Sequence, residues 1–319
     1  MDEAELTMRV TRREAAAADV LLIELESVQG ADLPAWAPGA HLELVLPSGV
    51  IRHYSLCGDP ADRSHYVVSV LRVADGRGGS IELHDEVLVD DTLLVRGPRN
   101  HFPLLDADAY LLLAGGIGVT PIVAMVRELE SRAADWRLVY GGRSASAMAF
   151  HDELAKFGDR VELVAQDQHG IPDLAAALEA APEGTAVYCC GPEGMLAAVA
   201  DLCDELGGRA SLHVERFGGT ADPDAHLGAD EHGFQVELRR SGMTLDVPAD
   251  RTILDVVLDV LPAHPHSCLE GECGSCETRV LDGVVDHRDQ LLTAEEQAEN
   301  SCMMICVSRA AGSRLVLDL

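Results

Sequence analysis

Four cysteines near the C-terminus have a spacing that suits an iron–sulfur cluster. Cys268, Cys273 and Cys276 form a C-x4-C-x2-C run, and Cys306 follows after 29 intervening residues. A plant-type 2Fe-2S cluster takes three thiolates from one tight loop and a fourth from a distant position. The spacing therefore predicts a 2Fe-2S site with these four residues as its ligands.

The surrounding residues support this interpretation and leave two alternatives. Gly271 and Gly274 let the backbone wrap closely around inorganic sulfides. A structural zinc site usually has two C-x2-C pairs, and this segment has one. Cys302 competes with Cys306 as the fourth ligand because both lie in one short run; we favour Cys306 and interpret Cys302 as a small core residue.

The C-terminal segment resembles plant-type ferredoxins from residue 234 to the end. Within them it is most similar to the ferredoxin module of phthalate dioxygenase reductases. The matching words are PHSC at 265–268, GECGSC at 271–276 and CVSR at 306–309.

Two short sequence motifs in the first hundred residues have residue types that could bind a flavin. Residues 52–56 read RHYSL, so an aromatic ring next to a serine could cover a flat ring system while the hydroxyl meets a ring nitrogen. Residues 76–80 read GRGGS, a turn that offers unhindered amides and a hydroxyl to a phosphate, with Arg52 as counter-charge. Taken singly, the words also fit an ordinary edge strand and a flexible turn.

Together the two words resemble the flavin-binding barrel of the ferredoxin reductase superfamily. The resemblance implies that Tyr54 stacks on the flavin ring and Ser55 hydrogen-bonds the hydride-accepting nitrogen, which makes Ser55 a catalytic residue. The GRGGS form is that of the phthalate dioxygenase reductase branch, which implies FMN rather than FAD. The implied flavin contacts are Arg52, His53, Tyr54, Ser55, Val70, Leu71, Arg72, Gly78, Gly79 and Ser80. His53 departs from the family, where threonine is frequent.

A third sequence motif could bind a dinucleotide. The apolar residues 111–114 are followed by GGIGVTP at 115–121. A helix is predicted over 122–129, and Pro121 suits the first helical position. A strand, a glycine turn and a helix N-terminus form an anion site for a pyrophosphate. The word is not the fingerprint G-x-G-x-x-G. It resembles the nicotinamide-binding word of the same superfamily, which implies contacts from Gly115, Gly116, Gly118, Thr120 and Pro121.

A fourth word, YCCGPEGM at 188–195, resembles that superfamily's C-G-P motif. The resemblance places Cys190, as a catalytic residue, with Gly191 and Pro192 at the nicotinamide. Phe217 would shield the flavin face until nicotinamide arrives, and its alternative is an ordinary core phenylalanine.

Arg143 lies where an adenosine ribose would be read, so the donor is NADH or NADPH. We favour NADH because the family generally prefers it.

The elements that must position these residues fall into three blocks. Short β-like runs separated by turns predict an antiparallel β-barrel for FMN at residues 1–104. Apolar strands alternating with helical stretches predict an α/β parallel-sheet domain for the nicotinamide at 105–218. A Gly-, Asp- and His-rich linker spans 219–232. A β-grasp 2Fe-2S ferredoxin domain follows at 233–319, with a hairpin and a helix that Thr252 caps.

The composition limits the partners. The 319 residues carry 24 basic against 54 acidic side chains, a net charge of −30. Such a charge disfavours nucleic acid and anionic membranes and favours a basic protein partner, although adaptation to salt explains it equally well. The acidic N-terminus and the cysteine usage predict a cytoplasmic protein.

The resemblance implies a reductase component of an oxygenase system, as in vanillate demethylase reductases. Electrons would pass from NAD(P)H through FMN and the 2Fe-2S cluster to a terminal oxygenase, either Rieske-type or haem-thiolate. The protein is expected to be a monomer. The alternatives are a reductase with another protein or small-molecule acceptor, and a non-catalytic protein whose C-terminal domain holds zinc or nothing.

Overall fold

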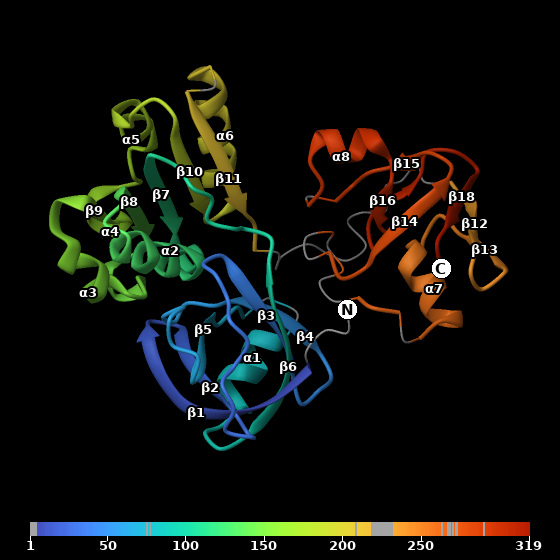
Figure 1. Cartoon of the computed structure of the whole chain (residues 1–319), viewed down its shortest axis with the longest axis horizontal. Helices are drawn as coiled ribbons and strands as arrows, with labels where there is room; N and C mark the ends of the chain where they lie inside the picture. Colours follow the sequence, from blue (N-terminus) through green and yellow to red (C-terminus); the bar gives the residue numbers. More distant parts are fainter. Residues whose placement is uncertain are drawn as a thin grey trace. The chain divides into compact units, whose positions relative to one another are not determined.

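The chain forms two compact units, Met1–Phe217 and Gly218–Leu319 (Figure 1). The computed structural model describes residues 5–74, 76, 78–207, 209–217, 232–262, 264–266, 269, 271, 274–289 and 291–319. The predicted linker therefore lies outside the described residues apart from His232. The division into three functional domains stays a prediction.

The first unit begins with a six-stranded antiparallel sheet. Its strand order is β4-β3-β6-β1-β2-β5. A bridge between Leu56, just after β4, and Val68 on β5 joins the two end strands and closes the sheet into a barrel. The elements are β1 (Glu5–Ala17), β2 (Val20–Ser27), β3 (Ala40–Val45), β4 (Ile51–Ser55), β5 (His65–Leu71), α1 (Gly79–Asp85) and β6 (Thr92–Asn100).

A five-stranded parallel sheet completes the first unit, in the order β11-β10-β7-β8-β9. The chain starts at the central β7, builds one side through β8 and β9, and then returns to the other side with β10, so the topological switch point lies between β7 and β10. The strands are β7 (Ala109–Gly115), β8 (Asp135–Gly142), β9 (Val161–Ala165), β10 (Thr185–Cys190) and β11 (Ala210–Glu215). The helices are η1 (Gly116–Gly118), α2 (Val119–Ser131), η2 (Ala145–Ala147), α3 (His151–Leu154), η3 (Ala155–Arg160), α4 (Gln166–His169), α5 (Leu174–Ala180) and α6 (Glu193–Glu205).

The second unit is a β-grasp fold around one apolar core. Its main sheet has the order β13-β12-β18-β14-β16, in which β12 and β18 run parallel. Helix α7 (Ile253–Val260) buries its apolar side against this core. The other elements are β12 (Phe234–Leu238), β13 (Met243–Val247), β14 (Glu277–Asp282), β15 (Val285–Asp286), α8 (Ala294–Glu299), β16 (Cys302–Met304), β17 (Arg309–Ala310) and β18 (Arg314–Leu317).

The predicted fold class is confirmed, and two local predictions need correction. Thr252 caps α7 through a capping box with Asp255, as expected. The GRGGS turn, however, leads directly into the short helix α1, with Gly78 in the left-handed region at φ 81°. Helix α2 begins at Val119, so Pro121 is its third residue rather than its first; proline is tolerated there because the first amides of a helix have no intrahelical partner.

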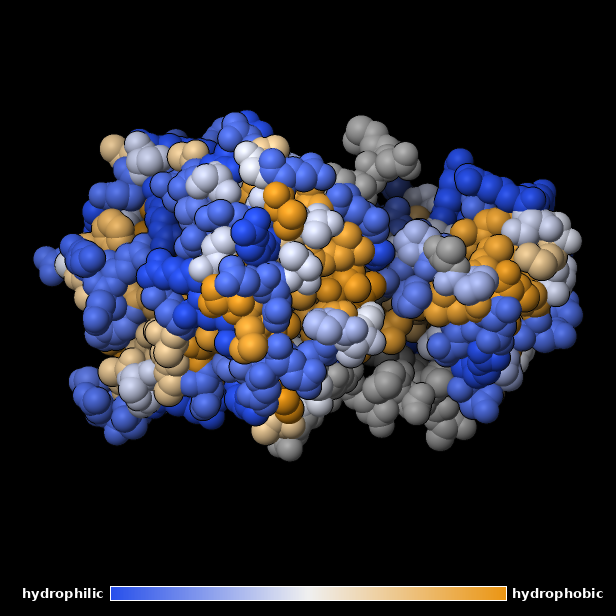
Figure 2. All heavy atoms as spheres, turned by 90° about the horizontal axis from the view of Figure 1, so that it is seen from below, coloured by the Kyte–Doolittle hydropathy of each residue, from blue (hydrophilic) through white to orange (hydrophobic). Residues whose placement is uncertain are grey.

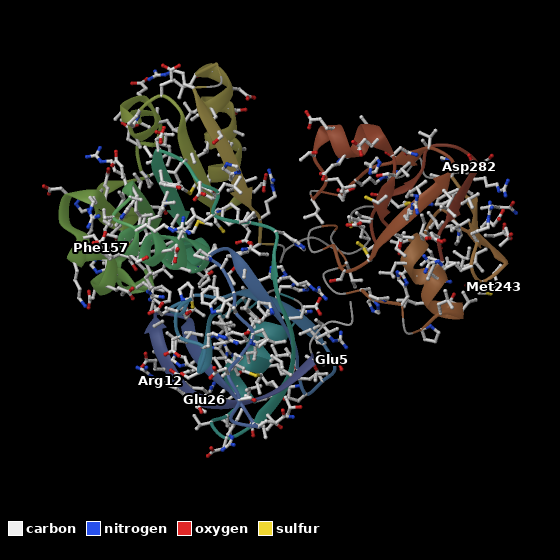
Figure 3. The ribbon with its side chains drawn as sticks, in the orientation of Figure 1. Glu5, Arg12, Glu26, Phe157, Met243 and Asp282 are labelled. Atoms are coloured by element: carbon white, nitrogen blue, oxygen red, sulfur yellow. The ribbon has the colours of Figure 1, made fainter. Side chains whose placement is uncertain are left out.

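The surface is largely hydrophilic, with apolar residues gathered in smaller patches on the face in view (Figure 2). Arg12 and Glu26 lie on the outside of the barrel strands (Figure 3), while Phe157 packs edge-on against Trp136 with the ring centroids 5.2 Å apart. No helix among the described residues is long and apolar enough to cross a membrane.

Candidate functional site

Ser55, at the end of β4, has a buried hydroxyl. Its side chain is 4% exposed, and its Oγ has no hydrogen-bond partner among the residues that the structure describes. A buried hydroxyl without a partner costs about 1–3 kcal/mol. Such a group indicates that a ligand completes the site, and a nitrogen of a flavin ring fits.

Tyr54, one residue earlier, offers a largely buried aromatic side chain. Burial raises its pKa well above the usual range of a phenol, so the hydroxyl stays neutral. Arg52 lies close enough to oppose that shift by its charge. Arg52 and Tyr54 lie two residues apart on β4, next to Ser55 at its end. A cation, an aromatic ring and a hydroxyl in one short segment suit a ring system with an attached phosphate.

The glycine turn before α1 lies directly against Arg52. A Cβ added to Gly79 would approach within 2.7 Å of both Cγ and Nε of Arg52. Ser80 accepts a hydrogen bond from the Val73 amide at 3.1 Å through its Oγ, so its own proton can still be donated. The guanidinium of Arg52, the backbone of Gly79 and the hydroxyl of Ser80 therefore belong to one small region. Together they fit a phosphate monoester.

Two further predicted flavin contacts are engaged with protein partners. Arg72 forms a two-pronged ion pair with Asp85 at 2.6 and 2.8 Å, which raises its pKa. The His53 imidazole lies 3.5 Å from the buried Glu43, which also accepts from Arg99 at 2.6 Å. Val70 is buried in β5, and Leu71 ends that strand. The roles of these residues toward a flavin stay predictions.

The two predicted nicotinamide-binding motifs, at 115–121 and 188–195, lie next to each other at the switch point of the parallel sheet. Strands β7 and β10 are neighbours in register, with Ala114 opposite Cys190. A Cβ on Gly118 would collide with the Cys190 carbonyl, and one on Gly115 would lie 2.6 Å from Pro192 Cδ. The two loops can touch only because these positions carry no side chain, and the carboxyl ends of strands at a switch point are where nucleotides bind.

The N-terminus of α2 starts from the same place. Gly116 has φ 55°, a left-handed conformation that glycine adopts without strain. Thr120 is buried and donates its hydroxyl to the Ile117 carbonyl at 3.0 Å, which closes the first turn. The amides that begin a 13-residue helix thus border the glycine loop, which suits a pyrophosphate.

Cys190 presents a neutral thiol at this edge. It is fully buried, and burial together with the Glu215 carboxylate raises its pKa well above the usual range of a thiol. Glu215 lies opposite Cys190 in the parallel register of β10 and β11. Glu215 belongs to none of the motifs found in the sequence, although its place at a strand end two residues before Phe217 was a usable signal.

The two remaining predicted nucleotide contacts lie at neighbouring strand ends. Arg143 is exposed directly after β8, the strand that pairs with β7. Phe217 follows β11 and is 42% exposed, which is inconsistent with the alternative of an ordinary core phenylalanine. Its predicted contact with the flavin stays a prediction.

Substituting Gly118 by alanine is expected to impair nicotinamide binding. The added Cβ would overlap the Cys190 carbonyl and force the two loops apart, so the Kd for NADH should rise by about 10-fold or more. The matched control is Gly194→Ala, because a Cβ there meets nothing within 4 Å. Titration calorimetry with NADH checks both, and equal affinities for the two variants would contradict the contact.

In the second unit, two of the predicted cluster ligands can be located. Cys276 and Cys306 are each 3% exposed and belong to the same buried core. Cys276 directly precedes β14, whose first residue Glu277 pairs with Met304, two residues before Cys306. The register therefore brings these two cysteines to the same end of the β14–β16 pair. Cys268 and Cys273 lie outside the described residues.

Gly271, within the three-cysteine loop, points to the fourth ligand. It has φ 73°, and a Cβ there would lie 2.6 Å from Cγ2 of Val307, the neighbour of Cys306. Cys302 instead pairs with Arg279, three residues along β14 from Cys276. Burial and the nearby Glu277 carboxylate raise the pKa of Cys302.

Comparison with protein families assigns the C-terminal part directly. Residues 236–311 match the family described as "2Fe-2S iron-sulfur cluster binding domain". Residues 101–211 match "Dimethylamine monooxygenase subunit DmmA-like, N-terminal domain". The predicted 2Fe-2S cluster is thus confirmed at the level of the domain.

Individual relatives match over the full length. The chain is 44% identical to phenoxybenzoate dioxygenase subunit beta of Ectopseudomonas oleovorans, covering 99% of this chain and 98% of the relative. It resembles the crystal structure of an intact type IV self-sufficient cytochrome P450 monooxygenase with a TM-score of 0.89 and 43% identity, spanning 99% of this chain but 41% of that longer one. A solved phthalate dioxygenase reductase, described as a modular structure for electron transfer from pyridine nucleotides to [2Fe-2S], matches with a TM-score of 0.72 and 38% identity over 99% of this chain and 98% of its own.

Proposed function

We propose that this chain, which belongs to the phthalate dioxygenase reductase family, is the reductase component of an oxygenase system. It takes electrons from NADH, passes them through FMN and a 2Fe-2S cluster, and delivers them to a terminal oxygenase. Since Arg143 is exposed where a 2′-phosphate would lie, NADPH is the alternative donor.

The Ser55 hydroxyl, which has no hydrogen-bond partner in the part of the chain that the structure describes, carries the flavin part of this proposal. It ends the same strand whose Arg52 lies against Gly79, so a donor for a ring nitrogen and a site for a phosphate belong to one short segment. The glycine loops at the switch point supply a separate site for the nucleotide.

A flavin accepts a hydride and releases single electrons, which matches a two-electron donor to a one-electron cluster. The residues of this chain supply binding and orientation. Ser55 offers a hydrogen bond at the ring, Tyr54 an aromatic face, and Arg52 a counter-charge for the phosphate. The neutral thiol of Cys190 adds no charge where the nicotinamide binds, and Phe217 covers the flavin in the absence of nucleotide.

The acceptor is a separate oxygenase, Rieske-type or haem-thiolate. Dioxygenase components among the relatives favour the first class, and the cytochrome P450 match favours the second. Cytoplasmic location and a monomeric state stay predictions from the sequence.

An absorption spectrum with cofactor analysis tests the relay. The purified protein should show flavin bands and the broad visible absorption of a 2Fe-2S cluster, release FMN on acid treatment, and bleach when NADH is added anaerobically. Release of FAD would refute FMN. Zinc in place of iron, with no flavin bands, would refute the whole proposal.

A further inference from the structure

Helix α2 joins the two cofactor sites of the first unit. It begins at the glycine loop of the nicotinamide site and is buried at every position from Val119 to Val126. A helix that is apolar all round is covered on all sides. Here it packs against its own sheet and against the barrel, whose Val20, Cys57 and Val67 share one core cluster with it (Figure 1).

Arg127 follows this buried stretch and reaches across to the barrel. Its Nη1 donates to the carbonyls of Cys57 and Gly58, the latter at 2.8 Å. These carbonyls come two and three residues after Ser55. The guanidinium therefore contacts the chain just where it leaves the proposed flavin strand.

The remaining nitrogens of Arg127 fix its position. Nε and Nη2 each donate to Glu153 at 2.8 Å, and the guanidinium carbon lies 5.8 Å from the centroid of the Phe150 ring. A planar guanidinium with five N–H donors can serve a carboxylate and two carbonyls at once, whereas a lysine ammonium cannot.

The segment that accepts these bonds is itself tied to β5. The amide and the thiol of Cys57 both donate to the Val67 carbonyl, at 2.9 and 3.4 Å. A Cβ on Gly58 would meet Val67 at 3.2 Å. A displacement of α2 would thus be transmitted through Arg127 to the end of β4 rather than absorbed by a loose loop.

We propose that Arg127 is a positioning residue for hydride transfer, holding the α2 helix of the nicotinamide site to the exit of the flavin strand so that the two bound rings meet at reacting distance. This inference rests on the proposed function. Hydride transfer needs the reacting atoms about 3–3.5 Å apart, and a misplacement of about 1 Å can slow a reaction about 100-fold. A second hydrogen bond, from the Ala18 amide to the Ser146 carbonyl at 2.7 Å, joins the barrel to η2 and does not involve α2.

The test compares Arg127→Met with Arg160→Met in the full-length protein. Arg160 is a matched control because it also pairs with a carboxylate of α2, Glu130, at 2.6 and 3.1 Å, and lies 4.6 Å over the Trp136 ring. The contacts of Arg160 with Glu130, Trp136 and Phe157 all lie in the parallel-sheet part of the unit, outside the barrel. Stopped-flow mixing with saturating NADH should show flavin reduction slowed about 10- to 100-fold in Arg127→Met. Little change is expected in Arg160→Met, and an intermediate rate in Arg127→Lys.

Two readouts separate positioning from a general loss of structure. The Kd for FMN and for NADH should stay close to those of the wild type, so the loss appears in the limiting rate per bound flavin. Hydrogen exchange of flavin-free protein should quicken at residues 56–60 and 150–155 in Arg127→Met but not in Arg160→Met.

An unchanged limiting rate in Arg127→Met, or an equal loss in Arg160→Met, would overturn the assignment. Unchanged exchange at residues 56–60 would overturn it as well. If NADH fails to reduce the flavin of the wild type, the proposed function is wrong, while the exchange experiment still tests the link.

Discussion

Cys306→Ala is expected to abolish the 2Fe-2S cluster and leave the flavin intact. The cluster requires four thiolates, and alanine offers no ligand in a site that is 3% exposed. Reduction of a one-electron protein acceptor such as cytochrome c should fall to background. NADH should still bleach the flavin at the wild-type rate, because the first unit folds around its own cores. Iron content and stopped-flow flavin reduction check the two halves of this prediction.

Cys302→Ala is the matched control for the fourth ligand. Cys302 lies four residues earlier on the same short run, and burial and the Glu277 carboxylate raise the pKa of its thiol. Its loss should cost about 1 kcal/mol or less of unfolding free energy and leave the iron content unchanged. If Cys302→Ala loses the iron and Cys306→Ala keeps it, the ligand assignment is reversed.

The sequence predicted well where local chemistry decides the structure. The strand–glycine–helix word at residues 115–121 predicted a nucleotide loop, and the structure places it beside Cys190 at the switch point. The capping of α7 by Thr252 likewise needs only residues 252–255. Spacing alone could not choose between Cys302 and Cys306, and the support for Cys306 comes from the approach of Gly271 to Val307, which are distant in the sequence. The ligand assignment stays a prediction.

What the sequence did not predict depends on contacts between distant segments. Arg127 is an unremarkable helix residue until folding brings it to the carbonyls of Cys57 and Gly58, about 70 positions earlier. Helix α1 was missed because it begins at Gly79, directly after Gly78, and glycines favour turns. Glu82, however, accepts from the Ser48 amide and hydroxyl at 2.8 and 2.6 Å and thus ties the helix to the β3–β4 connection. At α1, tertiary hydrogen bonds override the local preference for a turn.

Ser55→Ala is expected to slow flavin reduction by NADH about 100-fold while leaving the flavin-free protein as stable as the wild type or slightly more so. The rate falls because a donor aimed at the reacting ring is lost, and single donors of this kind are worth about 100- to 1,000-fold. Stability is not lost because the hydroxyl has no hydrogen-bond partner among the described residues. Stopped-flow reduction and urea unfolding of the flavin-free protein measure the two effects.

Ser69→Ala should give the opposite pair of results. Ser69 is 3% exposed in the same barrel, close to the exposure of Ser55, but its hydroxyl has a partner in the Cys57 thiol at 3.5 Å. Removing it should lower the unfolding free energy by about 0.5–1.5 kcal/mol and leave the rate of flavin reduction unchanged. A stability loss in Ser55→Ala that equals the loss in Ser69→Ala, together with an unchanged reduction rate, would mean that Ser55 is an ordinary core serine. The two measurements therefore distinguish the roles of the two serines. A buried hydroxyl whose removal leaves the flavin-free protein stable but slows flavin reduction is one that bonds to the cofactor.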